Sequence, residues 1–289
     1  MTIVVQQIFN ALSLASMYAL IALGITLVFG LTGLVNFAQG DLVMLGAMIA
    51  LWATPKVGFV VGTLLACVAM AVLSMALERG LFRRTRNSPL SGFMISLGLV
   101  LVLEGLAIAI WGNLTLQMPA PVPGRFVLGG VIIPQENLLT MAVAIPVLAI
   151  VFAFLYYTKV GTALRAIAVD SEVAAWIGIP VTKLVMWTFV VGGVLAALAG
   201  ALYAGLFPIN AYIDSDLVIR GFAVAIIGGL GNPAGVLVAA VIVAGVETGV
   251  SSTPLTAWID PIVFGLIVVI LLVRPTGLFR GAAGASLQQ

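Results

Sequence analysis

Two glutamates inside long apolar stretches are the residues of this sequence best suited to chemistry. Glu104 and Glu247 each stand within a run of mainly aliphatic residues. An acidic side chain at the centre of a bilayer costs about 2.5–3.5 kcal/mol, so both would face the interior of a bundle or a wet cavity. No Lys or Arg is placed to pair with them deep in a membrane. We therefore expect them to lie near an interface, to carry a proton, or to accept a hydrogen bond.

Other kinds of chemistry have little support in the sequence. It contains no histidine and one cysteine, which removes the usual metal ligand and general base and any site built from several cysteines. The phosphate-binding pattern G-x4-G-K-[S/T] occurs nowhere. We expect a chain that is not an enzyme, holds no metal and binds neither ATP nor another cofactor by itself.

Composition places the chain in a membrane. Of its 289 residues, 63% are hydrophobic and 8% are charged, whereas ordinary soluble domains are about 45–50% apolar and about 25% charged. Soluble enzymes, zinc proteins and secreted disulfide modules are excluded. The 12 basic and 10 acidic residues give a net charge of +2, too weak and scattered for nucleic-acid binding. The first basic residue is Lys56, so the opening apolar stretch is expected to be a retained helix rather than a signal peptide.

Long apolar runs define the elements that must position these residues. A hydrocarbon core about 30 Å thick takes about 20 residues of helix, and lipid cannot hydrogen-bond an open backbone. Eight candidate spans cover residues 7–30, 36–54, 58–78, 92–111, 138–157, 183–206, 233–250 and 257–273. A ninth stretch, 216–231, is short and rich in glycine. The sequence thus predicts an all-α, polytopic transmembrane bundle of about eight or nine membrane segments, in a single domain over 1–289.

Basic residues indicate the orientation of this bundle. They gather in three segments: Arg79, Arg83, Arg84 and Arg86; Lys159, Arg165 and Lys183; and Arg274 and Arg280. Cytoplasmic loops carry an excess of Lys and Arg, so all three segments are expected in the cytoplasm. All three segments can lie on one side only if the stretch 216–231 also crosses the membrane. The chain then has nine spans, with its N-terminus on the extracytoplasmic side and its C-terminus in the cytoplasm.

The loop 113–136 then lies on the extracytoplasmic side. Its prolines and Gly129-Gly130 flank an alternating apolar stretch, a pattern typical of a short hairpin. Two functions stay open for this loop: a spacer, or a platform for an external partner.

Two interrupted stretches are candidates for a transport pathway, because breaks at matching places in two halves of a membrane protein mark such paths. The first is 33–41, where a helix could begin at Asn36 or at Asp41, both good N-cap residues. The second is 226–235, which is rich in glycine. Their candidate pathway residues are Asn36, Gln39, Gly40, Asp41, Gly228 and Gly229. A loop capping a helix at the bilayer edge and a tight turn between two spans are the alternatives.

The segment 159–182 differs from its surroundings, because it is charged, rich in alanine and amphipathic. Asp170 and Ser171 suit a helix start, and Gly178 followed by Pro180 suits a helix end. These residues predict a helix–turn–helix along the inner surface. A loop lying on lipid headgroups is the alternative.

Four stretches together resemble one family. They are GLVNFAQGD at 33–41, GTALRAIAVDSEVAAWIG at 161–178, GGLGNPAG at 228–235 and RPTGLF at 274–279. In this order they are similar to the signature stretches of permease subunits of branched-chain amino-acid ABC importers, which are multi-pass proteins of the bacterial inner membrane.

The resemblance implies a set of partners. A second permease subunit, in a heterodimer, would share the translocation path. Two cytoplasmic ATPase subunits, which bind ATP and Mg, would drive it, and an extracytoplasmic binding protein would deliver branched-chain or related amino acids. The segment 159–182 would be the coupling helix seated on an ATPase. Its coupling residues would be Gly161, Arg165, Ala166, Asp170, Glu172, Ala174 and Gly178, with Val173 in place of an alanine of the family pattern.

One alternative function remains at this stage. A self-contained secondary transporter or channel for a small polar solute would use Glu104 and Glu247. The tripeptide Asn232-Pro233-Ala234, which is also found in water and glycerol channels, is weak support for it, since the matching position at Asn36-Phe37-Ala38 lacks the proline.

Overall fold

The computed structural model describes residues 2–85, 88–119, 121–122, 124–128 and 131–279. Arg86 and Arg280, two of the basic residues noted above, lie outside these ranges. The helices are α1 Thr2–Thr32, α2 Gln39–Val57, α3 Phe59–Gly80, α4 Pro89–Trp111, α5 Gln135–Tyr157, α6 Lys159–Val169, α7 Ser171–Trp176, α8 Val181–Leu206, α9 Ile213–Gly228, α10 Pro233–Ser251 and α11 Ile259–Val273. Short 3-10 turns cover Phe82–Thr85 and Thr256–Trp258. The prediction of an all-α bundle is confirmed.

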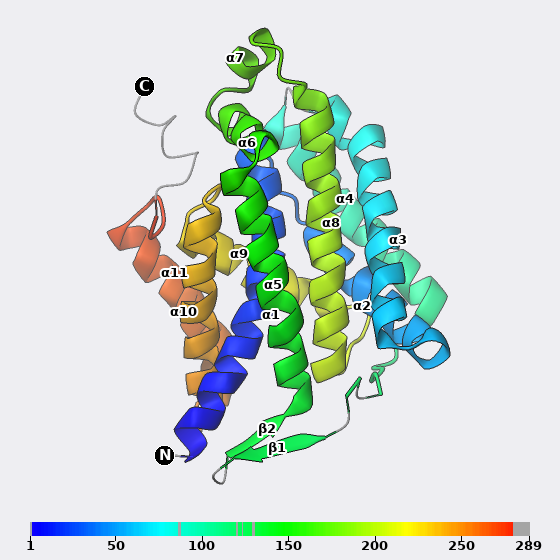
Figure 1. Cartoon of the computed structure of the whole chain (residues 1–289), viewed down its shortest axis with the longest axis vertical. Coiled ribbons are helices and arrows are strands. Elements are labelled where there is room, and N and C mark those ends of the chain that lie inside the picture. The colour runs from blue at the N-terminus through cyan, green and yellow to red at the C-terminus, as the bar shows by residue number, and fades with distance from the viewer. Residues whose placement is uncertain (1, 86–87, 120, 123, 129–130, 280–289) are drawn as a thin grey trace.

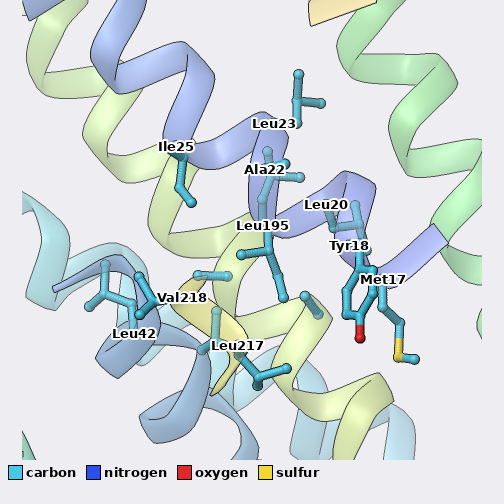
Figure 2. Packing of buried hydrophobic residues seen from close by; sticks show 14 of the residues in the cluster. Met17, Tyr18, Leu20, Ala22, Leu23, Ile25, Leu42, Leu195, Leu217 and Val218 are labelled. Carbon is cyan, nitrogen blue, oxygen red and sulfur yellow. The ribbon is translucent and has the colours of Figure 1, made fainter. Parts of the chain in front are cut away.

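Eight helical stretches of the described residues are long and apolar enough to cross a membrane: α1, α2, α3, α4, α5, α8, α10, and α11 together with the 3-10 turn before it. They match the eight spans expected from the sequence. Within the most apolar windows, 78% of α1 and 72% of α8 are buried, against 6% of α11. The core therefore lies around α1, α2 and α8, and the remaining spans present most of their surface outward. Figure 2 shows this core, where Leu195 of α8 lies among residues of α1, α2 and α9.

The bundle has two different ends (Figure 1). One end carries the N-terminus and an antiparallel hairpin of β1 Arg125–Leu128 and β2 Val131–Pro134, which confirms the predicted hairpin. We call it the hairpin end. The other end carries α6, α7 and the last described residues. The described basic residues of the three segments lie on elements that meet at this second end, which we call the basic end.

The stretch 216–231 forms part of a crossing. α8 runs to the hairpin end, where Leu116 and Ile209 form an isolated antiparallel bridge. Residues 207–212 then return into the bundle without helix, and α9 continues to the basic end. The part of this crossing nearer the basic end is helical, and the part nearer the hairpin end is not. This places the N-terminus and the last described residues at opposite ends, as the distribution of basic residues required.

α1 and α2 repeat this arrangement in the inverse direction. α1 runs to the basic end, residues 33–38 turn back, and α2 begins inside the bundle and runs toward the hairpin end. α2 packs against α8 and α3, as α9 packs against α1 and α10. Inverted repeats with discontinuous helices are typical of transporters, whose binding sites lie near the bilayer midplane.

Candidate functional site

The first turns of α2 and α9 meet inside the bundle. The side-chain amide of Gln39, at the start of α2, donates a hydrogen bond to the carbonyl of Gly192 in α8 at 3.0 Å. A Cβ atom on Gly40 would lie 2.7 Å from the carbonyl oxygen of Asp214, in the first turn of α9. Real Cβ atoms do not approach so closely, so Gly40 is what allows the two helix starts to touch.

Two buried carboxylates accompany this contact. Asp41 and Asp214 are almost fully buried, and neither oxygen of Asp41 nor Oδ1 of Asp214 has a hydrogen-bond partner among the described residues. Each stands in the first turn of a helix, where the positive end of the helix dipole stabilises a negative charge. Glu104 of α4 interacts electrostatically with both. We call Asn36, Gln39, Asp41 and Asp214 the polar centre.

The sequence predicted three members of the polar centre and missed the fourth. Asn36 is buried and its Oδ1 also lacks a partner among the described residues. The prediction that α2 begins at Asn36 or Asp41 is wrong. α2 begins at Gln39, and its N-cap residue is Ala38, which offers no side-chain hydrogen bond. Asp214 was overlooked because the second break was placed at 226–235. The break between α8 and α9 lies at 207–212. Pro208 and Asn210 in this stretch are residue types typical of turns, so they could have indicated it.

Gly228 and Gly229 lie away from the polar centre. They end α9 at the basic end, roughly 20 Å from its start at about 1.5 Å per residue. The backbone of Gly228 packs directly on Gly235, and Gly229 packs on the carbonyl of Phe279. The alternative of a tight turn between two helices describes this segment, while the pathway role of Gly228 and Gly229 stays a prediction.

Glu247 has a cationic partner, contrary to the sequence-based expectation. Arg220 Nε of α9 donates to Glu247 Oε1 of α10 at 3.1 Å, and the Tyr18 hydroxyl of α1 donates to Glu247 Oε2 at 2.8 Å. Arg220 Nη2 also donates to Asp260 Oδ1 at 3.1 Å. The expectation failed because Arg220 lies in the stretch 216–231. The sequence analysis considered only the length and the glycine content of this stretch, and did not count its arginine as a residue inside the membrane.

A cavity of about 490 Å³ opens beside this cluster toward the hairpin end. Its walls come from α1, α5, α8, α9, α10 and the start of α11, together with Pro134 at the end of β2. The guanidinium of Arg220 and the carboxylates of Glu136, Asp216 and Glu247 belong to its lining. No group of three or more Cys, Asp or Glu side chains in the described ranges is arranged to hold a metal ion.

At the basic end, α6 and α7 form the predicted helix–turn–helix. Thr158 caps α6 and Asp170 caps α7, with Asp170 Oδ1 accepting hydrogen bonds from the backbone amides of Glu172 and Val173 at 2.9 and 3.0 Å. Gly178 follows the end of α7 with a φ of +87°, which favours glycine. Gly161 lies at the α5–α6 corner, where a Cβ would collide with the carbonyl of Leu155.

Other expected coupling residues are divided between the interior and the surface. Arg165 turns back onto α5: its Nη1 donates to the Leu155 carbonyl at 2.6 Å, and its guanidinium lies 5.4 Å from the centre of the Tyr156 ring. Ala174 is buried, Ala166 is half-buried and Glu172 is exposed. Arg165 thus holds this segment against α5 from the surface, and Ala174 packs in its interior.

Several exposed side chains of this segment are apolar, which the sequence analysis missed. Val169, Trp176 and Ile177 are 83%, 76% and 72% exposed, and Val173 is also exposed. We call these four residues the apolar tip. They belong to the end of α6, to α7 and to the residue that follows it, and α7 projects beyond the main bundle (Figure 1). Contiguous exposed apolar residues mark interaction surfaces.

Comparisons with known proteins agree with this geometry. Residues 7–272 match the family described as the permease component of branched-chain amino acid transport systems. The chain is 31% identical to the permease protein LivH of Escherichia coli K12 and 30% identical to BraD of Pseudomonas aeruginosa, over 94% of each chain in both cases. Both are called high-affinity branched-chain amino acid transport system permease proteins. The fold is shared with a structure of PsaBC from Streptococcus pneumoniae in complex with Fab, at a TM-score of 0.52 and 13% identity, covering 97% of this chain and 94% of that one.

Proposed function

Because the chain belongs to the family of permease components of branched-chain amino acid transport systems, we propose that it imports branched-chain amino acids as one subunit of an ATP-driven transporter. It works as a single permease domain in the inner membrane of a bacterium. Its partners are a second, different permease, two cytoplasmic ATPase subunits that bind ATP and Mg, and an extracytoplasmic binding protein. This chain carries no catalytic step, since ATP hydrolysis takes place in the ATPases.

The apolar tip is the observation that carries this proposal. A segment that transmits force to a permease must be stiff and must present a surface to its motor. α6 and α7 have capped starts, α6 begins at the tight corner at Gly161, and α7 is followed by the turn at Gly178, which supports the first requirement. The exposed Val169, Trp176 and Ile177 support the second, because apolar side chains and aromatic anchors dominate the energetics of protein interfaces.

The expected coupling residues take two roles in this proposal. Glu172 and the exposed edge of Asp170 lie next to the apolar tip and meet the ATPase surface directly. Gly161, Arg165 and Ala174 hold α6 and α7 against α5 and α8, so that movement at the tip reaches the membrane helices. Because α5 continues into α6 through the corner at Gly161, a tilt of α6 pulls on the end of α5.

The polar centre is the proposed inner part of the substrate path. It lies where two discontinuous helices meet, which is where transporters of inverted-repeat design bind their cargo. Asn36 Oδ1 and the Asp41 carboxylate lack partners among the described residues, so they are available to the ammonium group of a passing amino acid. Specificity belongs mainly to the binding protein, because a path that binds tightly would trap its cargo.

The test is reconstitution in proteoliposomes. With its permease partner, the two ATPases and the binding protein, the chain should accumulate L-leucine inside vesicles whose lumen contains ATP. Without the ATPases, or with a non-hydrolysable nucleotide, uptake should stop. Ion-gradient-driven uptake by the chain alone would contradict the proposal and favour the self-contained transporter that Glu104 and Glu247 would serve.

A further inference from the structure

The cavity at the hairpin end has the size and position of a receiving site. Its volume of about 490 Å³ is within the range of about 300–1,000 Å³ typical of small-molecule pockets. Asp216 in its lining has a side chain that is 72% exposed, so the cavity reaches the surface of the chain there. Pro134 and Glu136, which follow the hairpin directly, form part of its wall.

Arg220 in this cavity has hydrogen-bonding capacity to spare. A guanidinium carries five N–H donors. Three of them reach acceptors within the described residues: Glu247 Oε1, Asp260 Oδ1 and the backbone carbonyl of Asp216. The planar fork of arginine matches a carboxylate with two parallel hydrogen bonds. Two N–H donors of Arg220 therefore remain for the carboxylate of a ligand.

The partners of Arg220 differ in how firmly they are held. Glu247 is mostly buried and also accepts a hydrogen bond from Tyr18. The Asp260 side chain is 66% exposed, and exposed ion pairs contribute about 0–1 kcal/mol. A ligand carboxylate can thus displace Asp260 from Arg220 while Glu247 keeps the guanidinium in place.

The rest of the cavity suits an ammonium group. Among the described residues, the lining contains one cation, Arg220, and the carboxylates of Glu136, Asp216 and Glu247, which leaves an excess of negative charge. Ser13 is 2% exposed, and its hydroxyl has no partner among the described residues. Gln7 Oε1, also in the lining, is likewise buried without a partner in that part of the chain. Buried polar atoms are rarely left unpaired, and these two oxygens are free to accept hydrogen bonds.

Apolar side chains complete the wall. Leu14 and Met17 of α1, Leu206 and Phe207 at the end of α8, and Leu217 of α9 line the same cavity. A compact aliphatic group would be covered by them.

We propose that this cavity is an entry site that receives the zwitterion of an aliphatic amino acid, with its carboxylate on Arg220 and its ammonium group toward Ser13. The proposal rests on the proposed function and adds to it a site at the hairpin end, separate from the polar centre. Binding there is weak, because the cargo must leave again toward the interior.

The test is direct binding of tritiated L-leucine to the purified full-length chain in lipid nanodiscs, with unlabelled competitors. L-leucine should compete, whereas leucinamide, which lacks the carboxylate, and 4-methylpentanoate, which lacks the ammonium group, should compete at least about tenfold more weakly, as expected for the loss of one charge-assisted contact. Equal competition by either analogue would overturn the proposal.

Two variants with one control locate the site. Asp260→Asn removes the displaceable carboxylate, so leucine should bind about threefold more tightly while leucinamide is unaffected. Ser13→Leu fills the cavity and should abolish binding. Ser16→Leu is the matched control: Ser16 stands one turn away on α1 and faces a separate apolar groove of about 400 Å³, so binding should persist.

The outcomes separate the two proposals. Folded wild-type chain that binds no leucine, or binding that Ser13→Leu and Asp260→Asn leave unchanged, would overturn the entry site. The proposed function would survive both results, provided that the complete transporter still takes up leucine on ATP.

Discussion

Arg220 of α9 and Glu247 of α10 lie 3.1 Å apart from Nε to Oε1, with both side chains mostly buried. The pair joins a half-helix to a full span through charges that neither helix could carry alone in a bilayer. Tyr18 adds α1 to the same cluster. The cluster therefore holds α1, α9 and α10 together.

Removing one member of this pair should destabilise the protein strongly. Glu247→Ala leaves Arg220 mostly buried with only its exposed partners, and breaking a buried pair costs about 3–5 kcal/mol. We expect a clear fall in the thermal midpoint of the purified protein in detergent. The double variant Arg220→Gln/Glu247→Gln should recover part of this loss, because it leaves no charge unpaired.

Asp216→Asn is the control for that prediction. The Asp216 carboxylate lies 3.9 Å from Arg220 and is largely exposed, so the change should cost less than about 1 kcal/mol. Equal losses for Asp216→Asn and Glu247→Ala would show that burial does not set the strength of these contacts.

The crossing of α2 and α8 should not tolerate a methyl group at Gly200. A Cβ there would collide with the backbone carbonyl of Val43, and backbone cannot rotate away as a side chain can. Gly200→Ala should cost about 1–3 kcal/mol, measured by thermal unfolding. Gly98→Ala is the matched control: Gly98 is an exposed residue of α4 with no heavy atom within 4 Å of the added Cβ, so stability should be kept or improved.

The apolar tip should be essential for transport and dispensable for folding. Trp176→Ala removes a side chain that is 76% exposed, so the free chain loses almost no packing. In the complete reconstituted transporter we expect ATP-driven leucine uptake to fall sharply, with unchanged insertion and thermal midpoint. Trp258→Ala, which removes an exposed tryptophan between α10 and α11 at the hairpin end, should leave uptake near normal. Equal uptake in both variants would rule out the tip as the ATPase contact.

Arg165 should transmit movement from α6 to α5. Arg165→Glu removes the 2.6 Å hydrogen bond to the Leu155 carbonyl and places a negative charge near that oxygen. We expect substrate-stimulated ATP hydrolysis to be abolished while membrane insertion stays intact. Arg165→Lys, which keeps a cation that can reach the carbonyl, should restore part of the stimulation. Normal stimulation in Arg165→Glu would contradict this role.

Local signals in the sequence were sufficient for most of the fold. The eight spans follow from the lengths of apolar runs, and the hairpin follows from alternation between Pro and Gly. The α6–α7 segment was predictable because Asp170 and Gly178 act on their own neighbours in the chain. Each of these features is decided within a few residues, which is why a single sequence reveals it.

Features that depend on distant contacts were missed. Arg220 and Glu247 belong to different helices and meet only because the turn at Gly228 and Gly229 sets α9 against α10. The start of α2 at Gln39 is fixed by its hydrogen bond to Gly192 of α8, rather than by a capping residue. Among the candidate pathway residues, Asn36, Gln39, Gly40 and Asp41 do come together with Asp214, but Asp214 could be added only once the return at 207–212 was known.

The corner between α9 and α10 also anchors the final described residues of the chain. The backbone amide of Leu278 donates to the carbonyl of Ile227 at 2.8 Å, and Phe279 covers Gly229. A truncation that removed these residues would leave the carbonyl of Ile227 without this donor at the C-terminal end of α9. Fraying would then start at the helix terminus opposite Asp214, so residues 278 and 279 stabilise the end of a helix whose other end carries a buried carboxylate.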